Sequence, residues 1–264
     1  MRPSRVRQRW DEGKVAGCIG VHLTDPAVCE LVTLLGFDCI WIDLEHHGTS
    51  LETASHMMRA ARVGGADVMA RPAKGELMRM GRMLEVGAHG ILYPRCDDAA
   101  EAAEVVRWAK FAPAGLRGFD SGNADCPYGL DAADRYVAAA NAQTWIAPQI
   151  ETPEAAAQAR AIAEVEGVDM LFFGPGDYSL ITGKPGQLFN DPATLEAAEQ
   201  VCRDALAAGK RFGTLTFNVE QTRRFIDLGA AFIACRFDIT LLRGALTQLR
   251  DELTSAGIAF DPLC

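Results

Sequence analysis

The chain has 264 residues and a mass of 28.5 kDa, which is enough for a large hydrophobic core in one or two domains. Hydrophobic residues make up 49% and charged residues 23% of the sequence, which excludes a mainly disordered, collagen-like or coiled-coil chain. The net charge of −9 opposes the charge of a phosphate backbone, so we expect no nucleic-acid partner.

The cysteines and the first residues of the chain indicate in which compartment the protein is located. No two cysteines have C-x-x-C spacing, which argues against a zinc knuckle or a redox motif. They are Cys18, Cys29, Cys39, Cys96, Cys126, Cys202, Cys235 and Cys264. The first residues lack the apolar core of a signal peptide, and no segment is long and apolar enough for a membrane span. We therefore expect a cytoplasmic protein with reduced thiols and no membrane partner.

In chain order, short apolar runs alternate with helix-like segments. Each run is nearly continuously apolar, as buried parallel strands are. The predicted strands are 16–21, 39–43, 67–71, 90–94, 145–151, 170–174, 211–216 and 232–236. The pairs Asp25-Pro26, Thr152-Pro153 and Asp191-Pro192 are typical of helix starts, and Gly36 ends the first of these helices.

The segments between the strands favour helices. Further helices are predicted at 50–61, 99–108, 131–143, 195–208, 221–228 and 241–253, and a Gly-, Pro- and Asp-rich interruption at 111–130. Eight strand-then-helix units in one chain of this length indicate a (β/α)8 TIM barrel, an α/β fold, as a single domain over residues 1–264. A doubly wound sheet is the competing fold, but it usually has fewer strands.

Polar residues gather where the predicted strands end. In a TIM barrel, catalytic residues lie at the carboxyl ends of strands or in the loops that follow them. The residues at these positions are Asp43, Glu45, His46, His47, Arg71, Gln149, Glu151, Asp177, Arg236 and Asp238. Taken singly, each also fits a solvated loop carboxylate, a structural histidine or a simple ion pair. Their convergence on one rim, with no comparable cluster at the strand starts, indicates an enzyme.

The residue types at this rim suggest chemistry with a hard cation. Glu151 and Asp177 are oxygen ligands suited to Mg²⁺ or Mn²⁺. Arg71 would balance negative charge on a developing enolate, and Asp43 would orient His46 as a general base. A Schiff-base mechanism is disfavoured because no lysine lies within a predicted core strand.

Six sequence segments resemble the HpcH/HpaI family of metal-dependent pyruvate aldolases. They are GFDCIWIDLEHHGTS (36–50), ARP (70–72), GAHGILYPRCDDAAEA (87–102), PAGLRG (113–118), QIET (149–152) and GPGDYS (174–179). The resemblance extends over about residues 15–255 in consistent order. It implies a barrel, a homo-oligomer (trimer or hexamer) that exchanges the C-terminal helix between subunits, and Mg²⁺, Mn²⁺ or Co²⁺ as cofactor.

The implied reaction is the reversible cleavage of a 4-hydroxy-2-oxo acid to pyruvate and an aldehyde through a metal-stabilised enolate. By position, the resemblance makes His46 the proton-transfer histidine with Asp43 as its partner. It makes Arg71 the residue that stabilises the enolate, and Glu151 and Asp177 the metal ligands.

The resemblance also implies how pyruvate binds. Gln149 matches a substrate-binding glutamine, and the backbone amides of Gly176 and Asp177 match those that bind the pyruvate carboxylate. Glu85 stands where well-known members carry an aspartate that raises the basicity of the histidine, so we expect it in the catalytic set with a longer reach.

Two departures from the family concern the acceptor aldehyde. His47 replaces a small residue or proline, and we expect it to pack rather than to contact the aldehyde. Residues 118–134 contain no Arg or Lys to hold a distal carboxylate, which favours a neutral or hydroxylated aldehyde. Three alternatives stay open: oxaloacetate decarboxylation, another lyase of the superfamily such as a CoA-thioester lyase, and a non-enzymatic ligand-binding barrel.

Overall fold

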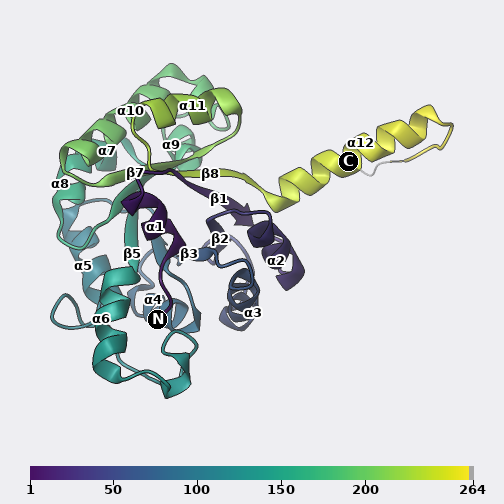
Figure 1. Cartoon of the computed structure of the whole chain (residues 1–264). Coiled ribbons are helices and arrows are strands. Elements are labelled where there is room, and N and C mark those ends of the chain that lie inside the picture. Colours follow the sequence, from purple (N-terminus) through teal and green to yellow (C-terminus); the bar gives the residue numbers. More distant parts are fainter. Residues whose placement is uncertain (262–264) are drawn as a thin grey trace.

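Eight short apolar runs form the strands of a closed parallel barrel in the computed structural model, which describes residues 1–261 (Figure 1). The strands are β1 (Ala16–Val21), β2 (Cys39–Asp43), β3 (Asp67–Arg71), β4 (Gly90–Tyr93), β5 (Trp145–Ile150), β6 (Met170–Phe173), β7 (Arg211–Thr216) and β8 (Phe232–Phe237). Each strand pairs with the next, and β8 closes on β1. The TIM-barrel prediction is therefore confirmed. Cys264 lies outside the described residues.

The predicted strands all exist, and the differences lie at their carboxyl ends. Pro94, Glu151 and Gly174 fall just past the strands to which the sequence assigned them, while β8 continues to Phe237. These residues therefore belong to the loops at the rim, where the backbone no longer follows the ladder of the sheet.

Most of the helices cover the outside of the barrel, and α1 and α12 are the exceptions (Figure 1). The helices are α1 (Arg5–Asp11), α2 (Pro26–Leu34), α3 (Leu51–Ala61), α4 (Leu77–Val86), α5 (Ala99–Ala109), α6 (Ala133–Gln143), α7 (Pro153–Ala157), α8 (Ala159–Glu164), α9 (Pro175–Ile181), α10 (Pro192–Ala207), α11 (Val219–Asp227) and α12 (Asp238–Ser255), with short 3-10 turns at Pro127–Gly129 and Leu188–Asn190. The sequence did not predict α1, α4 or α9. The Gly-Pro-Gly segment does not form only a turn, because Pro175 starts α9 and fixes a φ that suits a helix.

Two hydrophobic layers hold the barrel together. The outer layer packs the helices against the sheet, and the inner layer fills the barrel with large side chains such as Trp145, Phe172 and Phe232. Val6 and Trp10 of α1 belong to the inner layer, so α1 closes the end of the barrel at which the strands begin. The interior is thus open only toward the carboxyl ends of the strands, where the polar residues gather.

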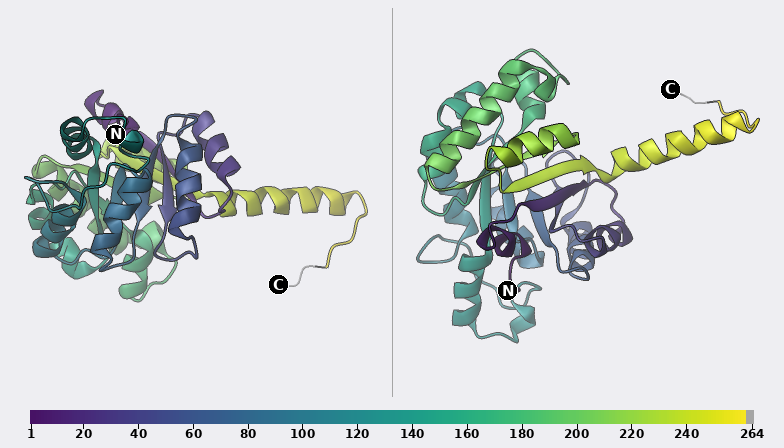
Figure 2. Two further views of the ribbon diagram at one scale, coloured as in Figure 1. Left: turned by 90° about the horizontal axis from the view of Figure 1, so that it is seen from below. Right: turned by 45° about the horizontal axis from the view of Figure 1, so that its top comes forward.

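The last helix, α12, leaves the barrel and projects away from it (Figures 1 and 2). Its first residue, Asp238, is anchored because its carboxylate accepts hydrogen bonds from the backbone N–H groups of His22 (2.8 Å) and Leu23 (3.0 Å). Beyond this anchor, Leu242, Leu246 and Leu249 are each more than two-fifths exposed. The helix therefore carries an apolar surface that its own barrel does not cover.

Within residues 1–261, no helix is both long and apolar enough to cross a membrane. The seven cysteines in the described part of the chain are free thiols, six of them buried.

Candidate active site

Strand register brings two of the predicted residues together. Asp43 and Arg71, the last residues of β2 and β3, are direct neighbours in the parallel ladder. Arg71 donates from Nε to Asp43 Oδ1 (3.0 Å) and from Nη2 to Asp43 Oδ2 (2.6 Å), a bidentate pair. Arg71 also lies over the Trp41 ring and is only 6% exposed. Burial alone would raise the pKa of Asp43, but the Arg71 guanidinium outweighs it and lowers this pKa.

A buried carboxylate faces the same space from β5. Glu151 follows the strand and is 2% exposed. Its Oε1 accepts a hydrogen bond from Gln149 Nε2 (2.8 Å), and its Oε2 accepts one from the backbone N–H of Arg95 (2.9 Å). Burial raises the pKa of Glu151 to about 8. A carboxyl group held in this way gains from a nearby cation, because the cation would offset the cost of its buried charge.

Gly174 makes this arrangement possible. A Cβ atom on Gly174 would lie 2.4 Å from Glu151 Oε1 and 2.7 Å from Gln149 Nε2, closer than real Cβ contacts. Any side chain here would therefore displace the two groups that line the site, and the glycine is required by close approach rather than by a turn.

Asp177 lies in the first turn of α9 and is paired with a residue that the sequence analysis missed. Arg95 Nη2 is 3.0 Å from Asp177 Oδ1. Arg95 has a positive φ of 47°, and its backbone N–H donates to Glu151. The sequence signal that could have identified it is its position directly after the predicted strand 90–94, because the other candidate residues also follow the ends of predicted strands.

His46 has a different carboxylate partner from the expected one. Its Nε2 lies 3.5 Å from Glu45 Oε2, whereas Asp43 Oδ1 accepts from the backbone N–H of His46 (3.4 Å). The Asp43 carboxylate instead binds the Arg71 guanidinium and the loop backbone. Glu45 Oε2 is buried and lies 3.2 Å from Arg71 Nε, but it has no hydrogen-bond partner among the described residues, so it can still accept from the imidazole. Burial raises the pKa of Glu45.

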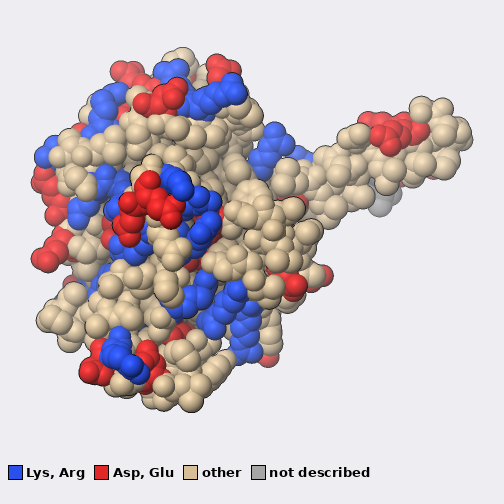
Figure 3. All heavy atoms as spheres, viewed as in Figure 1, with Lys and Arg blue, Asp and Glu red and all other residues tan. Residues whose placement is uncertain are grey.

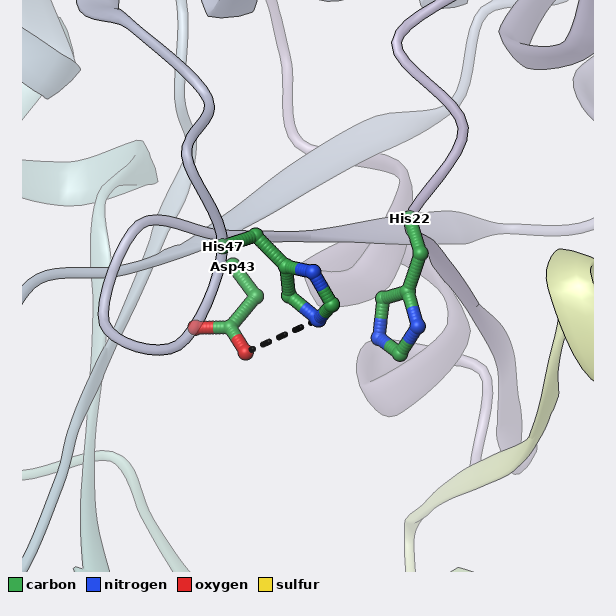
Figure 4. Close-up of side chains that lie close together, drawn as sticks. All are labelled: His22, Asp43 and His47. Atoms are coloured by element: carbon green, nitrogen blue, oxygen red, sulfur yellow. Dashed lines mark ion pairs between the residues drawn. The ribbon is translucent and has the colours of Figure 1, made fainter.

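His47 packs against a second histidine that the sequence analysis did not consider (Figure 4). The His22 and His47 rings lie 3.9 Å apart, and His22 also stacks on Phe237. His47 Nε2 is 3.8 Å from Asp43 Oδ2, and burial lowers the pKa of His22. Among residues 1–261, the group His22, Asp43 and His47 is the one set of three His, Cys, Asp or Glu side chains close enough to share a metal ion.

Two predicted elements lie elsewhere in the chain. Glu85 is in the last turn of α4, which leads to the start of β4, and its carbonyl accepts from the backbone N–H of Asp125 (3.2 Å). Residues 118–134 lie between α5 and β5, at this same end of the barrel, and run into the start of α6. Within one chain, both Glu85 and this loop therefore lie at the end of the barrel opposite His46. Burial raises the pKa of Glu85.

The remaining groups surround one small cavity. It has a volume of about 220 Å³. Its polar lining consists of His46, Arg71, Gln149, Glu151, Gly176 and Asp177, and its apolar lining includes Trp41, Phe172, Leu215 and Phe237. The residues predicted to bind a metal or pyruvate thus meet at one place, and apolar side chains complete the lining.

Comparison with known proteins identifies the class of molecule that this barrel and cavity belong to. The model of the HpcH/HpaI aldolase/citrate lyase family matches residues 20–245. The chain belongs to this family of aldolases, which are enzymes that break carbon–carbon bonds.

Individual relatives agree with the family match. A hydroxypyruvate/pyruvate aldolase of Pseudomonas aeruginosa is 33% identical over 246 residues, covering 93% of this chain and 91% of the relative. A 4-hydroxy-2-oxo-heptane-1,7-dioate aldolase of Shigella sonnei is 34% identical over 233 residues, 88% of each chain. The crystal structure of an HpcH/HpaI aldolase from Desulfitobacterium hafniense superimposes with a TM-score of 0.88 at 26% identity, covering 97% of this chain and 98% of that one.

Proposed function

We propose that this protein is a class II aldolase that reversibly cleaves a 4-hydroxy-2-oxo acid to pyruvate, or a related 2-oxo acid, and an aldehyde. The observation that carries the proposal is the meeting of Glu151, Asp177 and Arg71 around one cavity of about 220 Å³. Two carboxylates and a buried guanidinium are the groups that an enolate mechanism needs, and the cavity is of a size for a small oxo acid.

The donor set fits a divalent cation bound by Glu151 and Asp177, with Mg²⁺, Mn²⁺ and Co²⁺ as the candidates. Both ligands are carboxylates, and the pKa of Glu151 is raised to about 8 by burial, so a neighbouring cation would stabilise its charged form. When bound, the cation supplies a Lewis acid that polarises the 2-oxo group. The His22, Asp43 and His47 group suits the cation less well, because Arg71 already holds both Asp43 oxygens.

Arg71 is proposed to stabilise the enolate oxygen. Asp43 and the Trp41 ring fix the direction of the guanidinium, so it is already oriented before charge develops on the substrate. Nη1 lies 3.4 Å from Gln149 Oε1, so the glutamine that we propose binds the substrate lies beside it. Gln149 would hold the oxo acid, and the first-turn amides of Gly176 and Asp177 would receive its carboxylate.

His46 is proposed to take the proton from the 4-hydroxyl group during cleavage and to return it during condensation. Its imidazole is half exposed and reaches the cavity, while Glu45 lies behind it at 3.5 Å. In this arrangement Glu45 orients the ring, and Asp43 acts on the loop backbone and on Arg71. The proposal gives Glu85 no role within one chain, because Glu85 lies at the opposite end of the barrel from the cavity.

Exchange of the pyruvate methyl protons with deuterated water tests this function directly, because exchange needs the enolate and no aldehyde. The Mn²⁺-loaded protein should exchange these protons, which NMR can follow. Arg71→Ala should abolish both exchange and cleavage, and Arg71→Lys, which keeps the charge without the planar fork, should recover only part. Wild-type exchange with only a raised KM in Arg71→Ala would show a substrate clamp instead.

Oxaloacetate belongs in the same set of assays, because its decarboxylation passes through the same enolate. Faster turnover of oxaloacetate than of every 4-hydroxy-2-oxo acid tested would assign the protein as a decarboxylase.

We also propose that the chain acts as one domain and assembles into an oligomer through α12. Leu242, Leu246 and Leu249 repeat at helical spacing and are exposed, and most of α12 on the face shown in Figure 3 is uncharged. An open, largely apolar groove on the outside of the barrel is lined by Ile19, Phe37, Val219 and Leu241 among others. The groove lies where a helix after β8 would otherwise pack.

The oligomeric state tests this assembly. Light scattering should give a trimer or hexamer for the wild type, and Leu246→Asp should dissociate it. Glu252→Ala on the same helix is the matched control and should leave the assembly intact. A monomeric wild type would contradict the proposal. The cytoplasmic location expected from the sequence stays a prediction.

A further inference from the structure

Arg95 is a cationic residue at the candidate site to which neither the sequence analysis nor the proposed function gives a role. Its main chain is fixed on both sides. The N–H donates to Glu151 Oε2 (2.9 Å), and the carbonyl accepts from Lys74 Nζ (2.6 Å). Lys74 is itself held by Asp97 and Glu101, and these bonds raise its pKa although burial would lower it. The loop therefore presents the Arg95 side chain from a fixed point beside the proposed metal ligands.

The two arginines of the site differ in how many of their donors are used. Arg71 is 6% exposed and contacts Asp43, Glu45 and Gln149. The Arg95 side chain is 45% exposed and, within residues 1–261, has one side-chain partner, Asp177. A guanidinium has five N–H donors. Among the described residues, Arg95 uses one of these donors, to Asp177, whereas Arg71 uses three, to Asp43 and Gln149, so Arg95 has more donors to spare.

The present partner of Arg95 is also a proposed metal ligand. The guanidinium lies 3.0 Å from Asp177 Oδ1 and balances its charge. A divalent cation on Glu151 and Asp177 would take over this balancing role and weaken the attraction between Asp177 and Arg95. Metal binding would then leave a positively charged fork next to the bound substrate.

The size of the cavity indicates what this fork would meet. Arg95 is not among the residues that line the cavity of about 220 Å³, but its exposed side chain pairs with Asp177, which does line it. The cavity holds a small oxo acid, so the distal end of a longer substrate must pass the rim. A carboxylate there would match the guanidinium in charge and in bidentate geometry.

We propose that Arg95 determines acceptor specificity: it stands in for the cation on Asp177 in the metal-free site and binds an anionic distal group of the aldehyde when metal is bound. This inference rests on the proposed function. It reverses the expectation of a neutral aldehyde, which was drawn from residues 118–134. Within the chain that loop lies at the other end of the barrel, so its lack of Arg and Lys does not describe this rim.

The first test compares aldehydes of equal length in condensation with pyruvate. Succinic semialdehyde and butanal both have four carbons but differ in the distal carboxylate. In the Mn²⁺-loaded wild type, kcat/KM should favour succinic semialdehyde. Arg95→Met should lower the ratio of the two values by about 10- to 100-fold, mainly through KM for the charged aldehyde, and Arg95→Lys should lie between. An unchanged ratio in Arg95→Met would overturn the proposal.

The second test measures Mn²⁺ binding by calorimetry and needs no turnover. Removing the competing guanidinium should tighten Mn²⁺ binding to Arg95→Met by about 1.5- to 5-fold, the effect of one exposed ion pair. Arg107→Met is the matched control, because Arg107 is similarly exposed and paired with Glu104 on the outside of α5. Weaker Mn²⁺ binding in Arg95→Met would show that Arg95 supports Asp177 as a ligand, which contradicts the proposal.

The two hypotheses fail in different ways. If the Mn²⁺-loaded wild type does not exchange pyruvate methyl protons, the proposed function is wrong. If the wild type exchanges them but does not prefer succinic semialdehyde over butanal, the proposed function stands and only the role of Arg95 is wrong.

Discussion

The two ends of the barrel both bury acidic groups, but they surround them differently. At the end where strands begin, Asp67 is fully buried and accepts hydrogen bonds from Ser4 Oγ, the backbone N–H of Arg5 and Trp145 Nε1. At the end where strands finish, Glu151 is almost as buried, but of the residues that the structure describes only Gln149 and Arg95 donate to it, and it faces a cavity near Asp177 and Glu45.

This contrast separates a carboxylate that supports the fold, Asp67, from one that we propose acts in the reaction, Glu151. The donors around Asp67 come from α1 and β5, so its charge joins the N-terminal helix to the barrel. The Glu151 carboxylate instead has few donors to offset its buried charge, and it faces a cavity that a ligand can enter. Removing the first should therefore cost stability, and removing the second should cost activity.

The largest effect should follow from removing the proposed cation site. Chelation should abolish cleavage, and Mg²⁺, Mn²⁺ or Co²⁺ should restore it, because the Lewis acid is lost and regained. Glu151→Gln should show the same loss and should no longer bind Mn²⁺ in calorimetry. Full activity in a metal-free preparation would exclude this mechanism. Borohydride with pyruvate should trap no adduct, since no lysine lies in a strand of the barrel.

The next effect concerns His46. His46→Ala should lower kcat by about 10²–10⁴-fold, the usual loss when a general base is removed. His56→Ala, an exposed histidine on α3, is the control and should leave kcat unchanged. His47→Ala should reduce kcat by less than about tenfold, because His47 stacks on His22. A larger loss for His47 than for His46 would reassign the base to the pair of Asp43 and His47.

At the opposite end of the barrel, Asp67→Ala should destabilise the fold and leave the chemistry intact. The substitution leaves buried donors of Ser4, Arg5 and Trp145 without a partner, at a cost of about 3–5 kcal/mol in the free energy of unfolding. Denaturant titration measures this loss. At a temperature where the variant is folded, its kcat should equal that of the wild type. A stable Asp67→Ala variant with a lowered kcat would contradict the prediction that Asp67 contributes to stability and not to catalysis.

The smallest effect should come from a buried lysine at this same end. Burial lowers the pKa of Lys110 to about 8, while its Nζ donates to the carbonyls of Asn141 and Thr144. Because the folded state loses this proton before the unfolded state does, this residue's contribution to stability should rise as the pH increases from 8 toward 10.5.

Denaturant titrations of wild type and Lys110→Met across this pH range isolate the contribution of Lys110. The stability difference should shift in favour of the wild type by up to about 3 kcal/mol. Lys14→Met, at an exposed ion pair, should show no such pH dependence. A parallel pair of profiles for wild type and Lys110→Met would contradict the prediction.

The sequence by itself determined the barrel and the rim on which the site lies. Continuously apolar runs such as 39–43 and 67–71 have the composition of strands buried on both faces, and parallel strands must all end at one side of the sheet. This local pattern was enough to place Asp43, Arg71, Glu151 and Asp177 at the same end of the molecule. It failed for short helices such as α1 and α9, which depend on tertiary packing more than on periodicity.

Only the tertiary structure decided which of these side chains are partners. Register pairs residue 43 with residue 71, so the Asp43 carboxylate binds Arg71 and leaves His46 to Glu45. Arg95 reaches Asp177 across 82 positions of sequence, while Glu85, only ten positions before Arg95, lies at the other end of the barrel. Strand direction can be predicted from local residues. Side-chain partners depend instead on strand register, on the path of each loop and on which donors compete for an acceptor, and these are set only when the barrel closes.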